Sequence, residues 1–173
     1  EIQTSLVYCG DCLTNLQQFP EDCVDLIYID PPFNSNRHYE FCCNGTGERR
    51  SFKDRFKSVK HYIDWMAPRL EHIYRVLKLT GSFYYHCDWH ASHYVKIFLD
   101  ELFGSDNFRS EIVWERAIGT GSSKSITKSF GHNNDSIFFY TMSNDYTFHR
   151  PRTDYSPEYI KSKFRNKDER GLY

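Results

Sequence analysis

The stretch VDLIYIDPPF at residues 24–33 decides how this chain is expected to fold. Its first six residues are apolar except for Asp25, a pattern typical of a strand that is buried on both faces of a sheet. Asp30 and two prolines then end the strand, because proline cannot donate a hydrogen bond to a central ladder. We therefore expect a buried strand over residues 24–29, with Asp30 at its carboxyl end.

The segments on either side of this stretch alternate between helix and strand patterns. Apolar residues at helical spacing predict helices over residues 12–19, 59–77 and 91–102. Short apolar runs predict further strands over residues 6–8, 81–87, 110–114 and 136–141. Residues 34–58 are polar and read as a long loop. This alternation predicts an α/β fold with a mainly parallel sheet, in which ligands bind beyond the carboxyl ends of the strands.

Composition limits the classes of protein that the chain can belong to. Its 173 residues suit one domain, and 22 basic against 23 acidic residues argue against a histone-like coat for polyanions. No apolar run approaches the ~20 residues that span a bilayer, so no membrane partner is expected. The sequence shows no secretion leader, and we expect a cytoplasmic protein of a bacterial or archaeal cell.

The small net charge of −1 conceals an uneven distribution. Residues 1–46 hold seven carboxylates and one arginine, whereas the remainder is basic. The densest basic run contains Arg49, Arg50, Lys53 and Arg55, with aromatic residues interleaved. Such a run is either a solvated face or a set of phosphate contacts, and the second interpretation makes these four residues candidates for DNA binding.

Asp30, Pro31, Pro32 and Phe33 together form a chemically distinctive turn. The prolines remove two N–H donors, so nearby carbonyl oxygens and the Asp30 carboxylate form a set of acceptors beside a flat aromatic ring. This set suits an exocyclic amino group on a flat heterocycle. A strand ended by prolines, with Asp30 as a turn residue, explains the same residues, and their chemistry alone leaves both interpretations open.

Two other groups of polar residues are weaker candidates. His86 and Asp88 end the next predicted strand and so face the same edge, although capping of the following helix explains them equally well. Cys9 and Cys12 have the spacing of a metal knuckle, but no second pair follows, and we expect no metal.

Five segments of the chain together resemble those of a known family. VDLIYIDPPFNSNRHY is similar to the Asp-Pro-Pro-Tyr/Phe segment of AdoMet-dependent amino methyltransferases that act on DNA, where AdoMet is S-adenosyl-L-methionine. The resemblance to the N-terminal half of β-group adenine-N6 enzymes of restriction–modification systems continues in four more segments. They are YCGDCLTNL, HYIDWMAPRLEHIYRVLKLTGSFYYHCDWHASHYVK, LDELFGSDNFRSEIVW and HNNDSIFFYT.

The resemblance implies a Rossmann-like methyltransferase fold and roles for particular residues. Asp30, Pro31, Pro32 and Phe33 would form the catalytic motif, with Asp30 at the target amino group and Phe33 against a flipped base. Asp11 would lie near the adenine ring of AdoMet, and Asp30 would also contact the cofactor. An N-cap for the helix over residues 12–19 is an alternative role for Asp11.

The reaction implied is methyl transfer from AdoMet to the N6 amino group of a flipped adenine in double-stranded DNA. Family members that methylate cytosine N4 more often carry Ser or Thr in place of Asp30, so adenine is the expected target. The alternatives are a cytosine-N4 enzyme, a non-catalytic nucleic-acid-binding subunit, and a methyltransferase acting on RNA or protein amines. A restriction subunit and a second copy of the chain are further candidate partners.

The resemblance also implies how the chain is divided. Residues 1–145 would form the catalytic part, with residues 34–58 as a loop over the target base, and residues 146–173 would begin the target-recognition region. The Gly-rich AdoMet segment would lie beyond residue 173, because neither Gly-x-Gly segment of the chain follows a buried strand and opens a helix. The fold is therefore expected to be incomplete here.

We accordingly expect the 173-residue chain by itself to bind AdoMet weakly or not at all, and to be inactive. Isothermal titration calorimetry with AdoMet tests this expectation directly. Binding with a micromolar Kd would contradict it.

Overall fold

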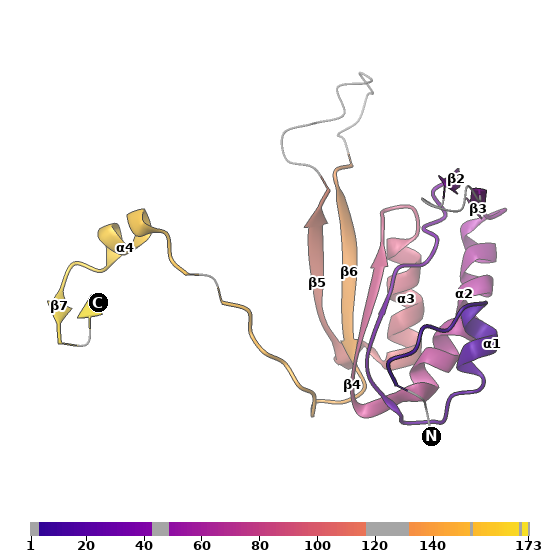
Figure 1. Cartoon of the computed structure of the whole chain (residues 1–173), viewed down its shortest axis with the longest axis horizontal. Coiled ribbons are helices and arrows are strands. Elements are labelled where there is room, and N and C mark those ends of the chain that lie inside the picture. The colour runs from indigo at the N-terminus through magenta and orange to yellow at the C-terminus, as the bar shows by residue number, and fades with distance from the viewer. Residues whose placement is uncertain (1–3, 43–48, 117–131, 153, 170, 173) are drawn as a thin grey trace, which may run out of the picture.

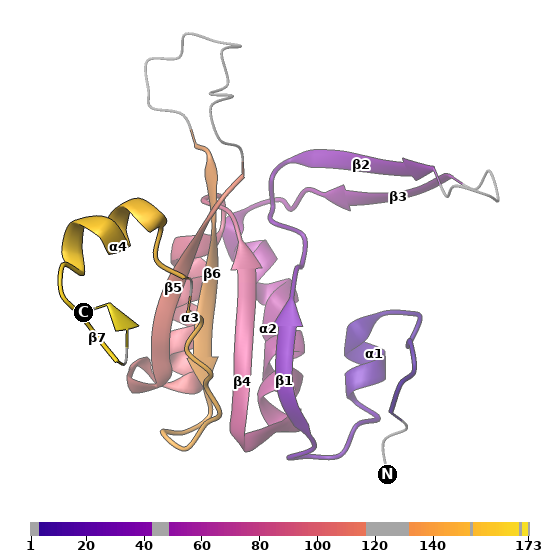
Figure 2. The ribbon, with the colours of Figure 1, turned by 60° about the vertical axis from the view of Figure 1, so that its left-hand side comes forward.

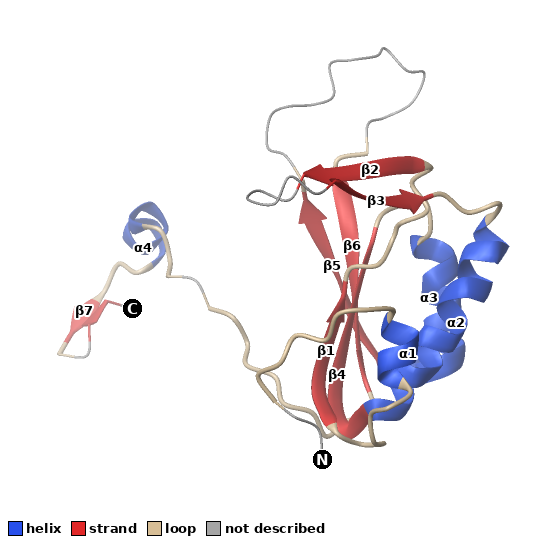
Figure 3. Ribbon diagram, turned by 45° about the vertical axis from the view of Figure 1, so that its right-hand side comes forward, coloured by secondary structure: helices blue, strands red, loops and turns tan. Residues whose placement is uncertain are grey.

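The computed structural model describes residues 4–42, 49–116, 132–152, 154–169 and 171–172, with no side-chain detail for 37–42, 49–53, 167 and 172. A four-stranded sheet forms the centre (Figure 1). In spatial order its strands are β1 (Val24–Ile29), β4 (Leu77–Cys87), β6 (Asn134–Thr141) and β5 (Phe108–Glu115). The helices α2 (Val59–Val76) and α3 (Ser92–Phe103) lie against one face of this sheet, and α1 (Cys12–Leu16) packs on α2 (Figure 3).

The α/β class is confirmed, but the sheet is mixed. β1 pairs with β4 in parallel, whereas β6 is antiparallel to both β4 and β5. The expectation of a mainly parallel sheet is therefore wrong for the pairings of these four strands. Alternating helices and strands predict parallel pairing only where a helix returns the chain between two neighbouring strands, as α2 does between β1 and β4.

The strand over residues 24–29 is confirmed as β1, but its burial on both faces is wrong. Leu26 and Tyr28 are 58% and 50% exposed because the helices cover only the opposite face. The apolar run thus predicted the position of the strand, but it did not show that helices pack on only one face of it. Residues 6–8 form no strand.

The core lies between the sheet and the two long helices. Tyr62, Met66 and Leu70 follow one another at four-residue spacing on α2, so they lie on one face and are buried together. That face meets alternate residues of β4, among them Tyr85, whose hydroxyl is 2.7 Å from that of Tyr62. The two buried phenols thereby satisfy each other's hydrogen-bonding needs.

Residues 34–58, expected to be a loop, contain an antiparallel hairpin instead. Its strands are β2 (Arg37–Cys42) and β3 (Arg49–Asp54), with Arg37 opposite Asp54. Figure 2 shows the hairpin extending sideways beyond the end of β1, on the side where Asp30 follows that strand.

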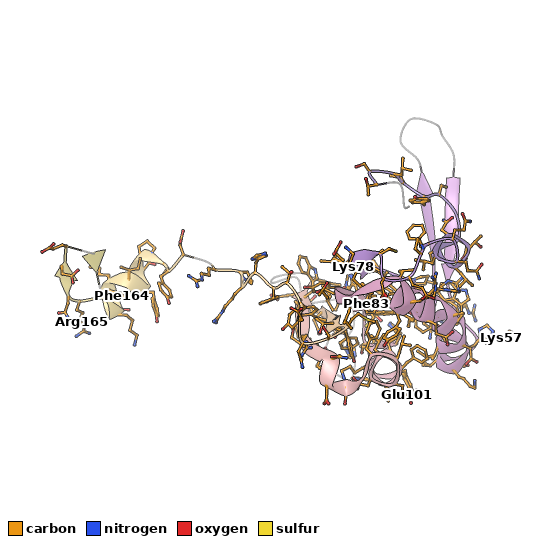
Figure 4. The ribbon with its side chains drawn as sticks, turned by 90° about the horizontal axis from the view of Figure 1, so that it is seen from below. Lys57, Lys78, Phe83, Glu101, Phe164 and Arg165 are labelled. Carbon is orange, nitrogen blue, oxygen red and sulfur yellow. The ribbon has the colours of Figure 1, made fainter. Side chains whose placement is uncertain are left out.

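Beyond residue 145 the chain first packs on β6, where the rings of Tyr146 and Phe148 contact that of Phe139, and it then runs away from the sheet. Figure 4 shows Phe164 and Arg165 far from Phe83 of the core. This part holds α4 (Pro157–Lys163) and a pair of two-residue strands, β7 (Lys167–Asp168) and β8 (Gly171–Leu172). The proposed division at residue 145 stays a prediction.

Asp11 begins α1 and holds it to α2. Its Oδ1 accepts a hydrogen bond from the backbone N–H of Leu13 at 2.8 Å, which is the geometry of an N-cap. Its Oδ2 lies 2.8 Å from the guanidinium of Arg69, which is stacked over the ring of Trp65. The Leu13 N–H and then Arg69 hold the pKa of Asp11 below its ordinary value.

Replacement of Asp11 by alanine should lower the free energy of unfolding by about 0.5–2 kcal/mol at neutral pH, the usual cost of losing a cap. Because the folded-state pKa is lowered, the stabilisation is complete above the unfolded-state pKa of about 3.9 and disappears as the pH falls through the folded value. Urea denaturation at neutral and acidic pH measures this, with the exposed Glu21→Ala as control. A difference from wild type that stays constant down to acidic pH would contradict the assignment.

Candidate active site

The parallel pairing of β1 with β4 creates the site. Ile29 is in register with Tyr85, so the next residues on the two strands, Asp30 and His86, meet at the carboxyl end of both strands. Asp30 Oδ1 lies 3.3 Å from His86 Nδ1. The Asp30 side chain remains 61% exposed, so its carboxylate is open to an incoming ligand.

His86 joins the segment from Asp30 to Phe33 to the rest of the sheet. Its ring meets that of Phe33 edge to face, with centroids 5.1 Å apart. Nδ1 is 2.9 Å from the Tyr28 hydroxyl, and Nε2 is 3.4 Å from Oδ2 of the buried Asp135 on β6. Burial, followed by the charges of Asp30 and Asp135, raises the pKa of Tyr28, so this hydroxyl stays protonated.

His86 and Asp88, at the carboxyl end of β4, have different roles in the structure. The Asp88 carboxylate holds the turn before α3, since it accepts from the backbone N–H of His90 at 2.9 Å and lies 2.9 Å from the His90 ring. The N-cap of α3 is Ala91, which has no side-chain cap hydrogen bond, so the alternative that Asp88 caps this helix is wrong. His86 instead faces Asp30, and sequence reasoning missed Tyr28 and Asp135, whose places beside it depend on strand pairing across the sheet.

A second group of hydrogen bonds fixes the chain just after Phe33. The buried carboxylate of Asp54, at the end of β3, accepts from the backbone N–H groups of Asn34 at 2.6 Å and Ser35 at 3.0 Å, and from the Ser35 hydroxyl. In return, the Asn34 side chain accepts from the backbone N–H of Phe56 at 3.2 Å. We call these contacts the Asp54 clasp. It ties the base of the hairpin to the residue that follows Phe33.

The candidate DNA-binding residues cluster on one element. Arg49, Arg50 and Lys53 belong to β3, and Arg55 directly follows it with an exposed side chain. The side chains of the first three lie outside the described residues, so their contact with DNA stays a prediction. Asp11 likewise keeps its cofactor role only as a prediction, beside its observed role as a cap.

Among the residues that the structure describes, no three His, Cys, Asp or Glu side chains gather as a metal site would require. Within that same part of the chain, no helix is long and apolar enough to cross a membrane.

The fold matches that of a known class of enzyme. The solved PvuII DNA methyltransferase, described as cytosine-N4-specific, superposes with a TM-score of 0.52 at 17% identity, covering 80% of this chain and 49% of that one. Such a likeness shows a shared Rossmann-like methyltransferase fold. Residues 24–172 match the family of N6/N4 methyltransferases described as DNA methylase, and the chain belongs to this family.

Three bacterial relatives resemble the chain in sequence. Type II methyltransferase M.KpnI of Klebsiella pneumoniae is 35% identical over 73% of the chain and 30% of its own length. The StyLTI Mod subunit, from a type III restriction-modification enzyme of Salmonella typhimurium, is 30% identical over 61% of the chain and 19% of its own length. The DNA adenine methyltransferase YhdJ of Escherichia coli is 30% identical over 61% of the chain and 31% of its own length. The chain thus matches under a third of the length of each relative.

Replacing Asp54 by asparagine should loosen the hairpin from the site. The new amide would point an N–H₂ group at backbone donors and leave at least one of them unpaired, which lowers the free energy of unfolding by about 1–3 kcal/mol. Denaturant unfolding measures the change. The control is Asp64→Asn, because Asp64 pairs with Lys60 at an exposed position, an interaction usually worth about 0.5 kcal/mol or less. Equal losses in the two variants would refute the clasp.

Proposed function

We propose that the protein transfers a methyl group from AdoMet to the N6 amino group of an adenine that is flipped out of double-stranded DNA. The observation that carries this proposal is the exposed carboxylate of Asp30 at the carboxyl end of β1, beside the half-buried ring of Phe33. A carboxylate accepts a hydrogen bond from an amino group, and a ring face stacks on a base. Membership of the DNA methylase family supports the same reading.

Asp30 would act by hydrogen bonding rather than as a nucleophile. The lone pair of an adenine amino group is delocalised into the ring, which makes the nitrogen a poor acceptor of a methyl group. Hydrogen bonds to Asp30 and to the carbonyl oxygen of Pro31 would favour a tetrahedral nitrogen and stabilise its developing positive charge. Each charge-assisted bond contributes on the order of 1.5–3 kcal/mol, and alignment of the reactants supplies more.

The residues at this edge of the sheet fit AdoMet by charge. The cofactor supplies a methyl group that is already activated by a positively charged sulfur, and Asp30 offers that charge an exposed carboxylate. Asp11 already accepts from Leu13 and pairs with Arg69, yet a carboxylate has about four lone-pair sites. Asp11 can therefore accept a further hydrogen bond from the cofactor without giving up its cap.

Adenine is the favoured target, and cytosine N4 is the second candidate. The relative from Escherichia coli is named a DNA adenine methyltransferase, whereas the enzyme with the similar fold is named cytosine-N4-specific. Asp30 favours adenine, because the adenine-N6 enzymes that the chain resembles carry aspartate at this position of the motif. Digestion of methylated DNA to nucleosides, followed by mass spectrometry, distinguishes the two products.

The remaining partners are proposed from the names of the relatives and from the distribution of charge along the chain. The basic residues of β3 and Arg55 would contact DNA phosphates as the hairpin reaches beyond Asp30. The Salmonella relative is a Mod subunit of a restriction-modification enzyme, which supports a restriction subunit as a partner. Action on DNA in bacteria would place the protein in the cytoplasm. Pairing with a second copy stays a prediction.

Substitution Asp30→Ala in the full-length protein should abolish methyl transfer, because the amino group loses its charged acceptor. Binding of DNA should change little, since the basic hairpin is untouched. Incorporation of labelled methyl groups and DNA mobility shifts measure the two properties. Asp25→Ala is the matched control, since Asp25 lies on the same strand in an exposed pair with Lys78. Retained turnover in the Asp30 variant would overturn the proposal.

A further inference from the structure

We propose that His86, supported by Asp135, receives from Asp30 the proton that the target amino group loses during methyl transfer. The inference rests on the proposed function and deepens it by naming the route by which the proton leaves. It makes His86 and Asp135 positioning and relay residues, while Asp30 remains the group that touches the substrate.

The reaction releases a proton at Asp30, and His86 offers it a route through the protein. When the bond from the methyl carbon to sulfur breaks and the bond to N6 forms, the electron pair of the broken bond stays on sulfur. N6 then bears a positive charge and must lose one of its two protons to give the neutral methylated base. Asp30, as the acceptor of that N–H, takes the proton first. A protonated Asp30 cannot serve as a charged acceptor in the next turnover until the proton moves on.

His86 is placed to take the proton from Asp30. Its Nδ1 lies 3.3 Å from Asp30 Oδ1, a separation that can shorten when substrate closes the site. Its Nε2 lies 3.4 Å from Oδ2 of Asp135. An O–H bond at Asp30 would break and an N–H bond at Nδ1 would form, while Asp135 stabilises the resulting imidazolium. The His86 side chain, which is 16% exposed, would then pass the proton from Nδ1 to water and return to its neutral form. An imidazole with a carboxylate behind it performs the same task in hydrolytic triads.

The neighbours of His86 favour the protonation state that the relay needs. In the relay, the protonated Tyr28 hydroxyl, 2.9 Å from Nδ1, donates to the single lone pair of that nitrogen and gives up this bond when Nδ1 takes the proton from Asp30. A neutral imidazole that accepts at Nδ1 carries its proton on Nε2, which faces Asp135. The resting side chain therefore presents a lone pair on the side of Tyr28 and Asp30.

The charges around His86 come from three strands. Tyr28 and Asp30 face the ring from β1 and its end, and Asp135 faces it from β6. Arg116, just beyond β5, lies 3.3 Å from the other oxygen of Asp135, but in the described residues this oxygen forms no hydrogen bond. Asp135 thus remains a strong acceptor for Nε2, and it is 5% exposed, which limits screening by water.

The first test measures methyl transfer to DNA by the full-length protein over a single turnover and over many turnovers. His86→Gln should lower the multiple-turnover rate by about 100-fold, a typical loss for removal of a proton-transfer group, while the first turnover and the DNA affinity change little, because Asp30 has to lose its proton only before the next cycle. The pH dependence of the rate should flatten, and added imidazole should restore activity to His86→Ala. Asp135→Asn, which preserves shape, should show a loss that is not additive with His86→Gln. His93→Gln, an exposed position on α3, is the matched control and should keep full activity.

The outcomes separate the relay from the proposed function. An inactive wild-type protein overturns both. An active wild type with His86→Gln within about two-fold of its rate overturns the relay alone. A slow His86→Gln variant with an unchanged pH profile and no rescue by imidazole shows a purely structural role and also overturns the relay. Thermal unfolding of each variant confirms folding, and if the His86 variants unfold, Asp135→Asn decides.

A second test needs no activity. Nitrogen-15 NMR of the histidine rings in the full-length protein, with the His86 signals assigned by their loss in His86→Gln, reports which nitrogen carries the proton. The relay requires the proton on Nε2 at neutral pH without ligands. A proton on Nδ1 would overturn it whatever the reaction catalysed.

Discussion

The register between β1 and β4 is the constraint on which the site depends. With Ile29 opposite Tyr85, Asp30 and His86 are at the same level and on the same edge of the sheet. Successive side chains of a strand point to opposite faces, so a slip of one residue would replace His86 by Cys87, which is buried beneath the helices. The imidazole would then no longer contact either Asp30 or Phe33.

This register is held from the helical side of the sheet. Phe83, Tyr85 and Cys87 face the core and alternate with Tyr84 and His86, which face the side without helices. The hydroxyl of Tyr62 on α2 meets that of Tyr85 in a setting where an unpaired phenol would cost free energy. A directional contact is thereby added to the non-directional packing of the apolar rings. The positions of Asp30 and His86 thus follow from the packing of the core-facing side chains of β4.

The sequence was most informative where a signal was local. The helices could be predicted from the spacing of their apolar residues. Asp30 could be identified because it lies between an apolar run and two prolines. The hairpin was missed because the many polar residues of 34–58, with Gly45 and Gly47, obscured the strand pattern. Asp54 and Asp135 were missed for a different reason, since their partners lie 19 to 49 positions away along the chain. Local patterns carry no information about such pairings, which exist only once the strands are in place.

The Asp54 clasp has a consequence for how such proteins can diversify. All its contacts join residues 34 and 35 to residues 54 and 56, so the segment between them is anchored at its base. A segment of this kind can be exchanged as a cassette, because new lengths and charges at the tip need not disturb the bonds at the base. Recombination between relatives, or grafting at the bench, could then alter what the arm touches while the ring of Phe33 keeps its place.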